Sequence, residues 1–265
     1  MVESTFIPKI EAACRKKEGL FDTSKGKYAV RSIFAGAFLT FSTGAGAIAA
    51  DLTNKIVPGT GRFLFPFIFA WGLAYIVFLN AELMTSNMMF LTAGTFLKKI
   101  DWKKALIILF YCTFFNLIGA LIAGWLFANS AAYAGLSKES FIAGVVQMKL
   151  ARSNELILLE GILANVFVNI AILSFVLVKD STAKLFLVIS AIYMFVFLTN
   201  EHLAANFASF AIVKFSSAAS QVANFGIGNI LRHWAVTFVG NLIGGGLLIG
   251  LPYAWFNKKE EYYVD

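Results

Sequence analysis

Charged residues are scarce in this sequence: Asp, Glu, Lys and Arg make up only 14% of its 265 residues, whereas 59% are hydrophobic. About a quarter of an ordinary soluble domain is charged, so this composition argues against a soluble enzyme. Cysteine is also rare, and two cysteines, Cys14 and Cys112, provide no disulfide framework. What remains is a chain rich in long apolar segments, which is typical of an integral membrane protein.

Six apolar segments are long enough to be membrane helices, and we expect residues 1–265 to form a single membrane domain. It would comprise an N-terminal segment (1–27), a six-span core (28–257) and a tail (258–265). The six segments are Ser32–Ala50, Phe63–Ala81, Ala105–Ala128, Gly161–Val178, Leu185–Asn200 and Trp234–Asn257. No apolar signal region precedes the first segment, so we expect that segment itself to direct insertion.

The net charge of +7 lies in the connections between the apolar segments. Most Lys and Arg residues precede the first segment, separate the second from the third, or follow the fourth and the sixth. These connections all lie on one side of a six-span protein, so the positive-inside rule predicts that both chain ends are cytoplasmic. Because the basic residues face a membrane surface, the high net charge does not indicate a nucleic-acid partner.

Polar residues interrupt the second and fifth segments in the same way. The second is followed by ELMTSN, residues 82–87, and the fifth by EHLAAN, residues 201–206; each motif reads Glu, four residues, Asn. Apolar runs too short to cross a bilayer follow, at Met88–Leu97 and Phe207–Phe215. Charge at membrane depth is costly, and interrupted helices at matching positions in two halves indicate a transport site. We therefore expect two inverted three-helix repeats whose broken helices meet near the membrane midplane.

A second pair of matching motifs follows these interruptions. The sequence NLIG occurs at 116–119 and again at 241–244, each time among glycine and alanine residues. Small residues let helix backbones approach closely, so we expect tight packing there. The fourth segment carries Asn165 and Asn169, which are four residues apart and therefore share one helix face. Near the N-terminus, residues 8–18 are either an amphipathic helix on the membrane or a solvated basic tail.

These motifs resemble those of the formate/nitrite transporter family. The family's signatures appear here as ELMT at 82–85, EHLAAN at 201–206 and GNLIGGG at 240–246, and the similarity extends from about Pro8 to Phe256. The resemblance implies an all-α, aquaporin-like fold in which the second and fifth of six transmembrane helices are broken. It also implies a homopentamer in the lipid bilayer of a bacterial inner membrane, with one pore in each protomer.

The resemblance further implies roles for individual residues. It assigns pore constrictions to Phe69, Leu73, Leu83 and Phe195, the polar centre of the pore to Thr85, His202 and Asn241, and the attraction of anions to Lys149 and Asn165. Leu83, Thr85 and Lys149 in this setting are similar to the family's hydrosulfide-channel branch. Met84 departs from the usual phenylalanine, but its side chain need not face the pore. By topology Lys149 lies in an extracellular loop, where it either draws anions or is simply solvated.

Four polar residues of the interruptions are expected to be structural, namely Glu82, Asn87, Glu201 and Asn206. A carboxylate that lines an anion pore would repel its substrate. We therefore expect both glutamates to accept hydrogen bonds from backbone N–H groups of the interruptions or from the opposite half. A proton relay through these carboxylates is the alternative.

His202 is the only histidine inside a predicted span, since His233 lies at an interface. A buried neutral histidine without a transport role is the simpler interpretation of a lone histidine, but the repeated interruption favours a functional one. A neutral imidazole donates from one nitrogen and accepts at the other, so His202 can polarise a small anion, or lend it a proton if charged. Because the interruptions should meet, we expect His202 to lie close to Thr85.

Together these features favour a channel for small monovalent anions and not an enzyme, with no cofactor and no metal site. Half-helices that start at the interruptions direct the positive ends of their dipoles inward, which favours anions. The resemblance favours hydrosulfide as the substrate, with formate or nitrite also possible. A proton-coupled transporter, a neutral-solute channel and a structural or sensor protein are the alternatives. The aquaporin Asn-Pro-Ala pair is absent, because neither interruption contains proline.

Overall fold

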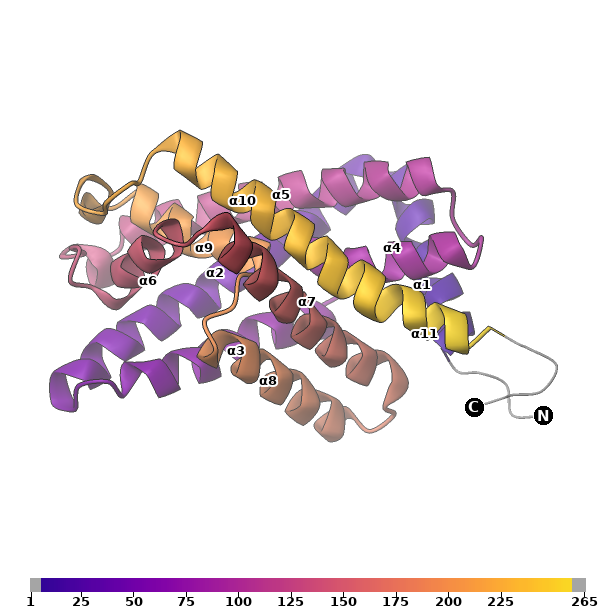
Figure 1. The fold of residues 1–265 in the computed structure, drawn as a ribbon, viewed down its shortest axis with the longest axis horizontal. Helices are drawn as coiled ribbons and strands as arrows, with labels where there is room; N and C mark the ends of the chain where they lie inside the picture. Colours follow the sequence, from indigo (N-terminus) through magenta and orange to yellow (C-terminus); the bar gives the residue numbers. More distant parts are fainter. Residues whose placement is uncertain (1–5, 259–265) are drawn as a thin grey trace.

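The computed structural model describes residues 6–258, and over this range the chain is helical and contains no β-strand (Figure 1). The first five residues of the expected N-terminal segment, and residues 259–265 of the expected tail, lie outside the described range. The elements are α1 (Phe6–Thr23), α2 (Lys25–Ile56), α3 (Gly61–Phe78), α4 (Met84–Phe96), α5 (Trp102–Ala128), η1 (Ala131–Tyr133), α6 (Phe141–Leu150), α7 (Asn154–Leu177), α8 (Ser181–Phe197), α9 (Leu203–Lys214), η2 (Ser217–Ser220), α10 (Ile227–Asn241), η3 (Leu242–Gly250) and α11 (Leu251–Phe256).

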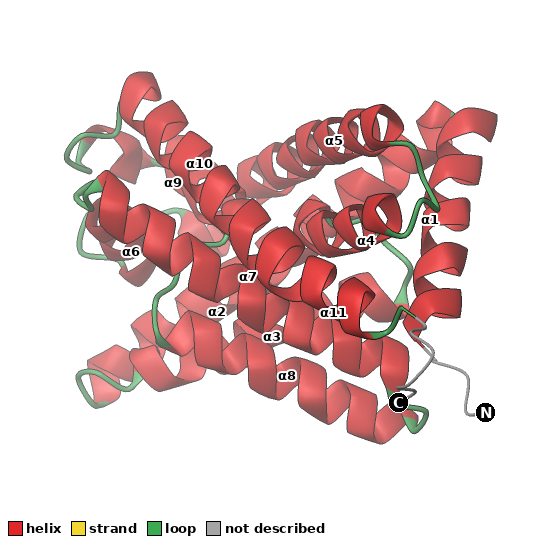
Figure 2. Cartoon of the chain, turned by 45° about the vertical axis from the view of Figure 1, so that its right-hand side comes forward, coloured by secondary structure: helices red, strands yellow, loops and turns green. Residues whose placement is uncertain are grey.

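Within the described range, five helical stretches are long and apolar enough to cross a membrane: α2, α3, α5, α7 and the continuous helix formed by α10, η3 and α11. The predicted fifth span corresponds to α8, which has 17 residues and is followed by α9. The long helices pack in two groups, since α2 lies against α3 and α5, while α7 lies against α8 and α10 (Figure 2).

Several helices are longer than the predicted apolar segments, because their ends are set by caps and turn residues. Residues 51–56, which were expected in a loop, are the last turns of α2, since no helix breaker precedes Pro58. α5 begins at Trp102 because the side chain of Asp101 accepts a hydrogen bond from the N–H of Lys103 (2.9 Å). Polar and charged residues thus extend the helices beyond the apolar segments.

Both predicted interruptions are present as breaks between helices. α3 ends at Phe78 and α4 begins at Met84, while α8 ends at Phe197 and α9 begins at Leu203. The second half-helices begin four residues earlier than predicted. As a result, the second part of the first polar motif lies in the first turn of α4 and that of the second motif in the first turn of α9. Both helices therefore begin at the breaks.

α1 and α6 are peripheral helices at opposite ends of the molecule (Figures 1 and 2). α1 packs on α4 and buries Ile10, Cys14 and Phe21. Residues 8–18 therefore lie in an amphipathic helix, as one of the two alternatives predicted, and the apolar face of this helix rests on the protein; the alternative of a solvated tail is wrong. α6 packs on α9 and α2 and occupies part of what was expected to be an extracellular loop. Each peripheral helix thus contacts one of the two half-helices.

The glycine-rich motifs allow close helix packing, as predicted. A Cβ atom added to Gly119 would lie 1.9 Å from the carbonyl oxygen of Ile33, and one added to Gly244 would lie 2.1 Å from the carbonyl oxygen of Ile162. Any side chain at these positions would separate α5 from α2 and η3 from α7. η3 is a π-helical stretch, a form that is frequent at functional sites.

Candidate functional site

Asn116 of α5 holds the backbone of the break between α3 and α4. Its side-chain oxygen accepts a hydrogen bond from the N–H of Met84 (2.9 Å). Its Nδ2 donates to the carbonyl oxygens of Glu82 (2.9 Å) and Ser32 (2.8 Å). Buried backbone groups need such partners wherever a helix is interrupted.

Asn241 of α10 does the same at the break between α8 and α9. It accepts from the N–H of Leu203 (2.9 Å), and its Nδ2 donates to the carbonyl oxygens of Glu201 and Gly161 (2.8 Å each). Asn241 was expected in the polar centre of the pore, yet both of its amide hydrogens are used by the backbone. The equivalent task of Asn116 was missed, although the shared NLIG motif was the signal for it.

A buried ion pair lies beside each break. Lys17 of α1 donates to Glu82 Oε2 (2.6 Å), and Lys149 of α6 donates to Glu201 Oε2 (2.7 Å). The glutamates therefore bind lysines, and the expectation that they bind backbone N–H groups of the breaks is wrong. Lys149 is only 7% exposed, so the expectation of a loop residue is also wrong. Helix α6 turns this lysine inward.

The asparagine of each motif is tied to its ion pair in a different way. Asn206 donates directly to Glu201 Oε2 (2.9 Å). Asn87 donates to the hydroxyl of Tyr28 (3.0 Å), which itself donates to Glu82 Oε2 (3.3 Å). Both arrangements fix a buried carboxylate to the first turn of a half-helix.

Glu201 has two further neighbours with basic side chains, Arg152 and His233. Arg152, which follows α6, contacts Glu201 Oε1 and lies 2.6 Å from Glu160 Oε2. Arg152 also donates to the carbonyl oxygen (3.0 Å) and hydroxyl (2.9 Å) of Thr199. Thr199 has a φ of +60°, which is unusual for a β-branched residue, so Arg152 stabilises a strained turn. His233 of α10 brings Nε2 within 3.3 Å of Glu201 Oε1.

His202 and Thr85 lie side by side, as predicted, with 2.8 Å between His202 Nε2 and Thr85 Oγ1. His202 is the N-cap of α9, and its Nδ1 accepts a hydrogen bond from the N–H of Ala205 (3.2 Å). An accepting Nδ1 carries no proton, so the proton of the neutral ring is on Nε2 and is donated to Thr85. A charged ring would lose the cap and repel the helix N-terminus. The hydroxyl hydrogen of Thr85 is therefore free to bind a ligand.

Asn165 and Asn169 of α7 support this centre. Both donate to the carbonyl oxygen of Thr85 (3.3 and 3.4 Å), and Asn165 also donates to the carbonyl oxygen of Asn241 (2.7 Å). Asn169 Nδ2 also donates to the carbonyl oxygen (2.8 Å) and to Oδ1 (3.0 Å) of Asn165. The contacts of Asn165 described here do not include Lys149, its expected partner in attracting anions. The structure groups Asn165 with Thr85 instead.

Apolar side chains enclose the imidazole of His202. Phe195 lies against it, with ring centroids 5.6 Å apart, and packs edge-on against Phe69 at 5.9 Å. Leu73 and Leu83, the other two residues expected at constrictions, are also buried. All four residues thus lie in the enclosed interior.

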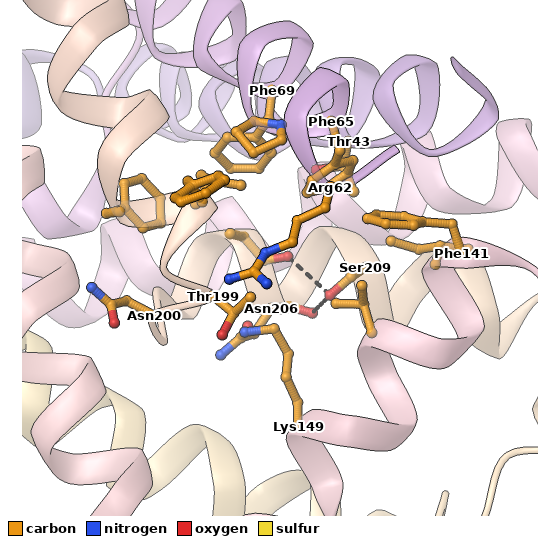
Figure 3. Close-up of a pocket in the computed structure, with 17 residues that line it drawn as sticks. Thr43, Arg62, Phe65, Phe69, Phe141, Lys149, Thr199, Asn200, Asn206 and Ser209 are labelled. Atoms are coloured by element: carbon orange, nitrogen blue, oxygen red, sulfur yellow. Dashed lines mark hydrogen bonds between the residues drawn. The ribbon is translucent and has the colours of Figure 1, made fainter. Parts of the chain in front are cut away.

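A cavity of about 70 Å³ lies beside α6 and ends at Phe195 (Figure 3). We call it the α6-side cavity; its lining includes Arg62, Phe69, Lys149, Phe195, Thr199 and Asn206. In Figure 3 the side chains of Arg62 and Lys149 approach Thr199 and Asn206 from opposite sides. Two cationic side chains thus enter a cavity whose inner end is aromatic.

A second cavity, of about 150 Å³, lies beside α1. The lining of this α1-side cavity includes Lys16, Lys17, Ile76, Asn80, Glu82 and Ser86. His202 and Thr85 line neither cavity. Phe195, whose ring packs on His202, lines the α6-side cavity, and Ser86, which follows Thr85 in the chain, lines the α1-side cavity, so each cavity reaches a residue next to the pair.

Comparison with known proteins identifies relatives over nearly the whole chain. The family model described as formate/nitrite transporter matches residues 4–255. An uncharacterized transporter of Bacillus subtilis, YwcJ, is 27% identical over 98% of this chain and 100% of its own length. Two solved structures share the fold. One, described as an FNT family ion channel, has a TM-score of 0.85 at 23% identity and covers 96% of this chain and 98% of its own. The other, a pentameric formate channel with formate bound, has a TM-score of 0.74 at 22% identity, covering 88% and 97%.

Proposed function

This chain belongs to the formate/nitrite transporter family, and we propose that it is a passive channel for small monovalent anions, with hydrosulfide as the main substrate and formate and nitrite as further candidates. One observation carries the proposal. The hydroxyl of Thr85, which neutral His202 orients, is an uncommitted donor, and residues next to this pair line two cavities that also contain lysine side chains.

Positive charge on both approaches supports an anionic substrate. Arg62 and Lys149 line the α6-side cavity, and Lys16 and Lys17 line the α1-side cavity. In addition, α4 and α9 both begin next to the centre, so the positive ends of their dipoles act on it. A cation would meet unfavourable charge at each of these points.

Among the described side chains of the centre, the Thr85 hydroxyl is the donor left without an acceptor, which suits a substrate with one accepting atom. The amide hydrogens of Asn165, Asn169 and Asn241 are used in hydrogen bonds, and the Nε2 hydrogen of His202 is used by Thr85. Formate and nitrite each carry two oxygens, and one of them would stay unpaired in an apolar enclosure, which is costly. Hydrosulfide exposes a single sulfur, and we therefore rank it first.

We propose that the anion crosses with its charge and that His202 stays neutral. Protonation would remove the hydrogen bond from Ala205 to His202, so this ring is a poor proton source. Its task is to fix the Thr85 hydroxyl, which polarises the passing anion, while Phe69 and Phe195 restrict the passage to small ions. The rival is proton-coupled transport, in which the anion takes its proton elsewhere.

We further propose six membrane spans in two inverted repeats, assembled as a pentamer in a bacterial inner membrane with both chain ends cytoplasmic. The matching bonds of Asn116 and Asn241, and the matching ion pairs of Lys17 and Lys149, support the repeats. The pentameric formate channel of similar fold supports the assembly. Native mass spectrometry that finds a stable monomer or trimer would contradict it.

Flux into proteoliposomes tests the function. Hydrosulfide, formate and nitrite are followed side by side by stopped flow, and the anion current is recorded in planar bilayers. We expect downhill flux of each anion, hydrosulfide fastest, with a current that reverses at the anion's equilibrium potential. Accumulation driven by a pH gradient alone would identify a proton-coupled transporter, and solute flux without anion current a neutral-solute channel. Protein-free vesicles correct for neutral H₂S that crosses the lipid.

A further inference from the structure

His233 is a buried histidine that the mechanism above does not use. It has no exposed surface, and neither ring nitrogen has a hydrogen-bond partner of good geometry in the structure. Its ring packs against Phe210, with centroids 5.4 Å apart. Its Nε2 lies 3.3 Å from Glu201 Oε1, slightly long for a hydrogen bond to a carboxylate. Buried polar atoms are normally paired, so an unpaired imidazole beside a carboxylate requires an explanation.

The carboxylate of Glu201 is shared by more donors than it can hold tightly. Oε2 accepts from Lys149 and Asn206, while Oε1 contacts Arg152 and faces His233. A carboxylate has about four lone-pair positions; Lys149, Asn206 and Arg152 occupy three of them, and His233 faces the carboxylate without a hydrogen bond of good geometry. A stronger bond to one donor therefore weakens the hold on the others.

The charges of this cluster balance only while His233 is neutral. From α6 and the residues after it come Lys149 and Arg152, from α7 comes Glu160, and from the break comes Glu201. On α10 itself, the neighbouring Arg232 is directed elsewhere, to Asn154 Oδ1 and to backbone oxygens of residues 150 and 152. Two cations then face two anions, and a proton on His233 leaves one positive charge in excess beside the α6-side cavity.

We infer that His233 is a positioning residue that acts through Glu201 on Lys149, and that its protonation makes the α6-side cavity more attractive to anions. A charged imidazole draws Glu201 Oε1 towards α10 and loosens the contact of Glu201 with Lys149. Lys149 lines the cavity, so its ammonium group is then more available to an entering anion. The inference rests on the proposed function.

The other end of the molecule has no counterpart of this histidine among its described residues. The NLIG motifs align Asn241 with Asn116, and the same alignment sets His233 opposite Ile108, which is fully buried. Glu82 instead accepts from the hydroxyl of Tyr28, a neutral donor. We therefore assign the pH response to the α6 end alone.

The test measures formate flux into proteoliposomes at about pH 5.5 and pH 7.5, across the range in which histidine titrates. Formate is mostly ionised at both values, and protein-free vesicles correct for neutral formic acid, whose share rises at the lower pH. For the unmodified chain we expect flux to be about tenfold faster at the lower pH, the lower end of the range for focusing by fixed charge. His233→Gln keeps a polar side chain without titration and should reduce this ratio to nearly one. An unchanged ratio in His233→Gln would overturn the inference.

A second variant keeps the test decisive if His233→Gln does not fold. Lys149→Met removes the lysine that a charged His233 would release from Glu201. It should therefore also bring the ratio of flux at the lower pH to flux at the higher pH close to one, although His233 is intact. Lys17→Met, at the other end, should lower flux at both pH values and leave the ratio in place. A ratio that survives Lys149→Met would contradict the inference. If the unmodified chain carries no formate at either pH, the proposed function fails first, and the two failures are thus distinguished.

Discussion

The break between α3 and α4 and the break between α8 and α9 are held alike but charged differently. Asn116 and Asn241 make the same three bonds to the backbone at the two sites. By contrast, Glu82 faces one lysine and a tyrosine, whereas Glu201 faces a lysine, an arginine and a histidine. The shared bonds are required wherever a membrane helix is interrupted, and the different charges set what each cavity offers to an ion.

Removal of the asparagine that holds each break should have a large effect, and the same effect at both ends. Asn241→Leu and Asn116→Leu each remove the partner of one N–H and one carbonyl of a break, at about 1–3 kcal/mol apiece, so we expect a loss of at least about 2 kcal/mol in stability. Thermal unfolding in detergent, followed by size-exclusion chromatography, measures it. Asn129→Leu, at an exposed helix end, is the control and should behave like the unmodified protein. A large difference between the stability losses of Asn116→Leu and Asn241→Leu would contradict the equivalence of the two breaks.

Replacement of each glutamate by neutral glutamine should destabilise the protein to different extents at the two breaks. Glu201→Gln leaves Lys149 without its carboxylate and Arg152 with Glu160 alone, whereas Glu82→Gln affects only one cation, Lys17. Breaking a buried pair costs about 3–5 kcal/mol, so we expect Glu201→Gln at or above this range and Glu82→Gln at its lower end.

The same unfolding assay compares these variants, and Lys149→Met added to Glu201→Gln should restore part of the loss. Equal destabilisation by the two single changes would show that the additional cation at the α6 end contributes nothing.

Removal of the side chain that holds the turn of each break should give the smallest difference in stability between the two ends. Arg152 is buried and bonds Thr199, while the exposed Lys16 donates to Asn80 Oδ1 (2.9 Å). Asn80 also has positive φ, but asparagine tolerates it better than threonine. We expect Arg152→Ala to cost about 2 kcal/mol, and Lys16→Ala less than about 0.5 kcal/mol. If Thr199→Asn reduces the loss of stability caused by Arg152→Ala, the positive φ of Thr199 accounts for part of this difference between the two breaks.

The sequence predicts the breaks and the central pair, because both follow from local chemistry. A charged motif in an apolar run must be buried in protein, and two such motifs must meet, which brings His202 to Thr85. The partners of the glutamates could not be predicted in this way. Lys17 and Lys149 lie on short peripheral helices, 65 and 52 residues from their carboxylates. For Asn241, nothing in the sequence decides whether its amide faces a pore or the backbone.

The central claim is that the Thr85 hydroxyl, fixed by neutral His202, is the donor that a passing anion meets. The hydrosulfide current in planar bilayers tests it most directly, with Thr85→Val, which keeps the shape without the hydroxyl, beside Thr85→Ser, which keeps the hydroxyl. A hydrogen bond to a charged group is worth about 1.5–3 kcal/mol, so we predict that Thr85→Val lowers the current by about tenfold or more, while Thr85→Ser retains most of it. A current in Thr85→Val equal to that of the unmodified channel would contradict the account.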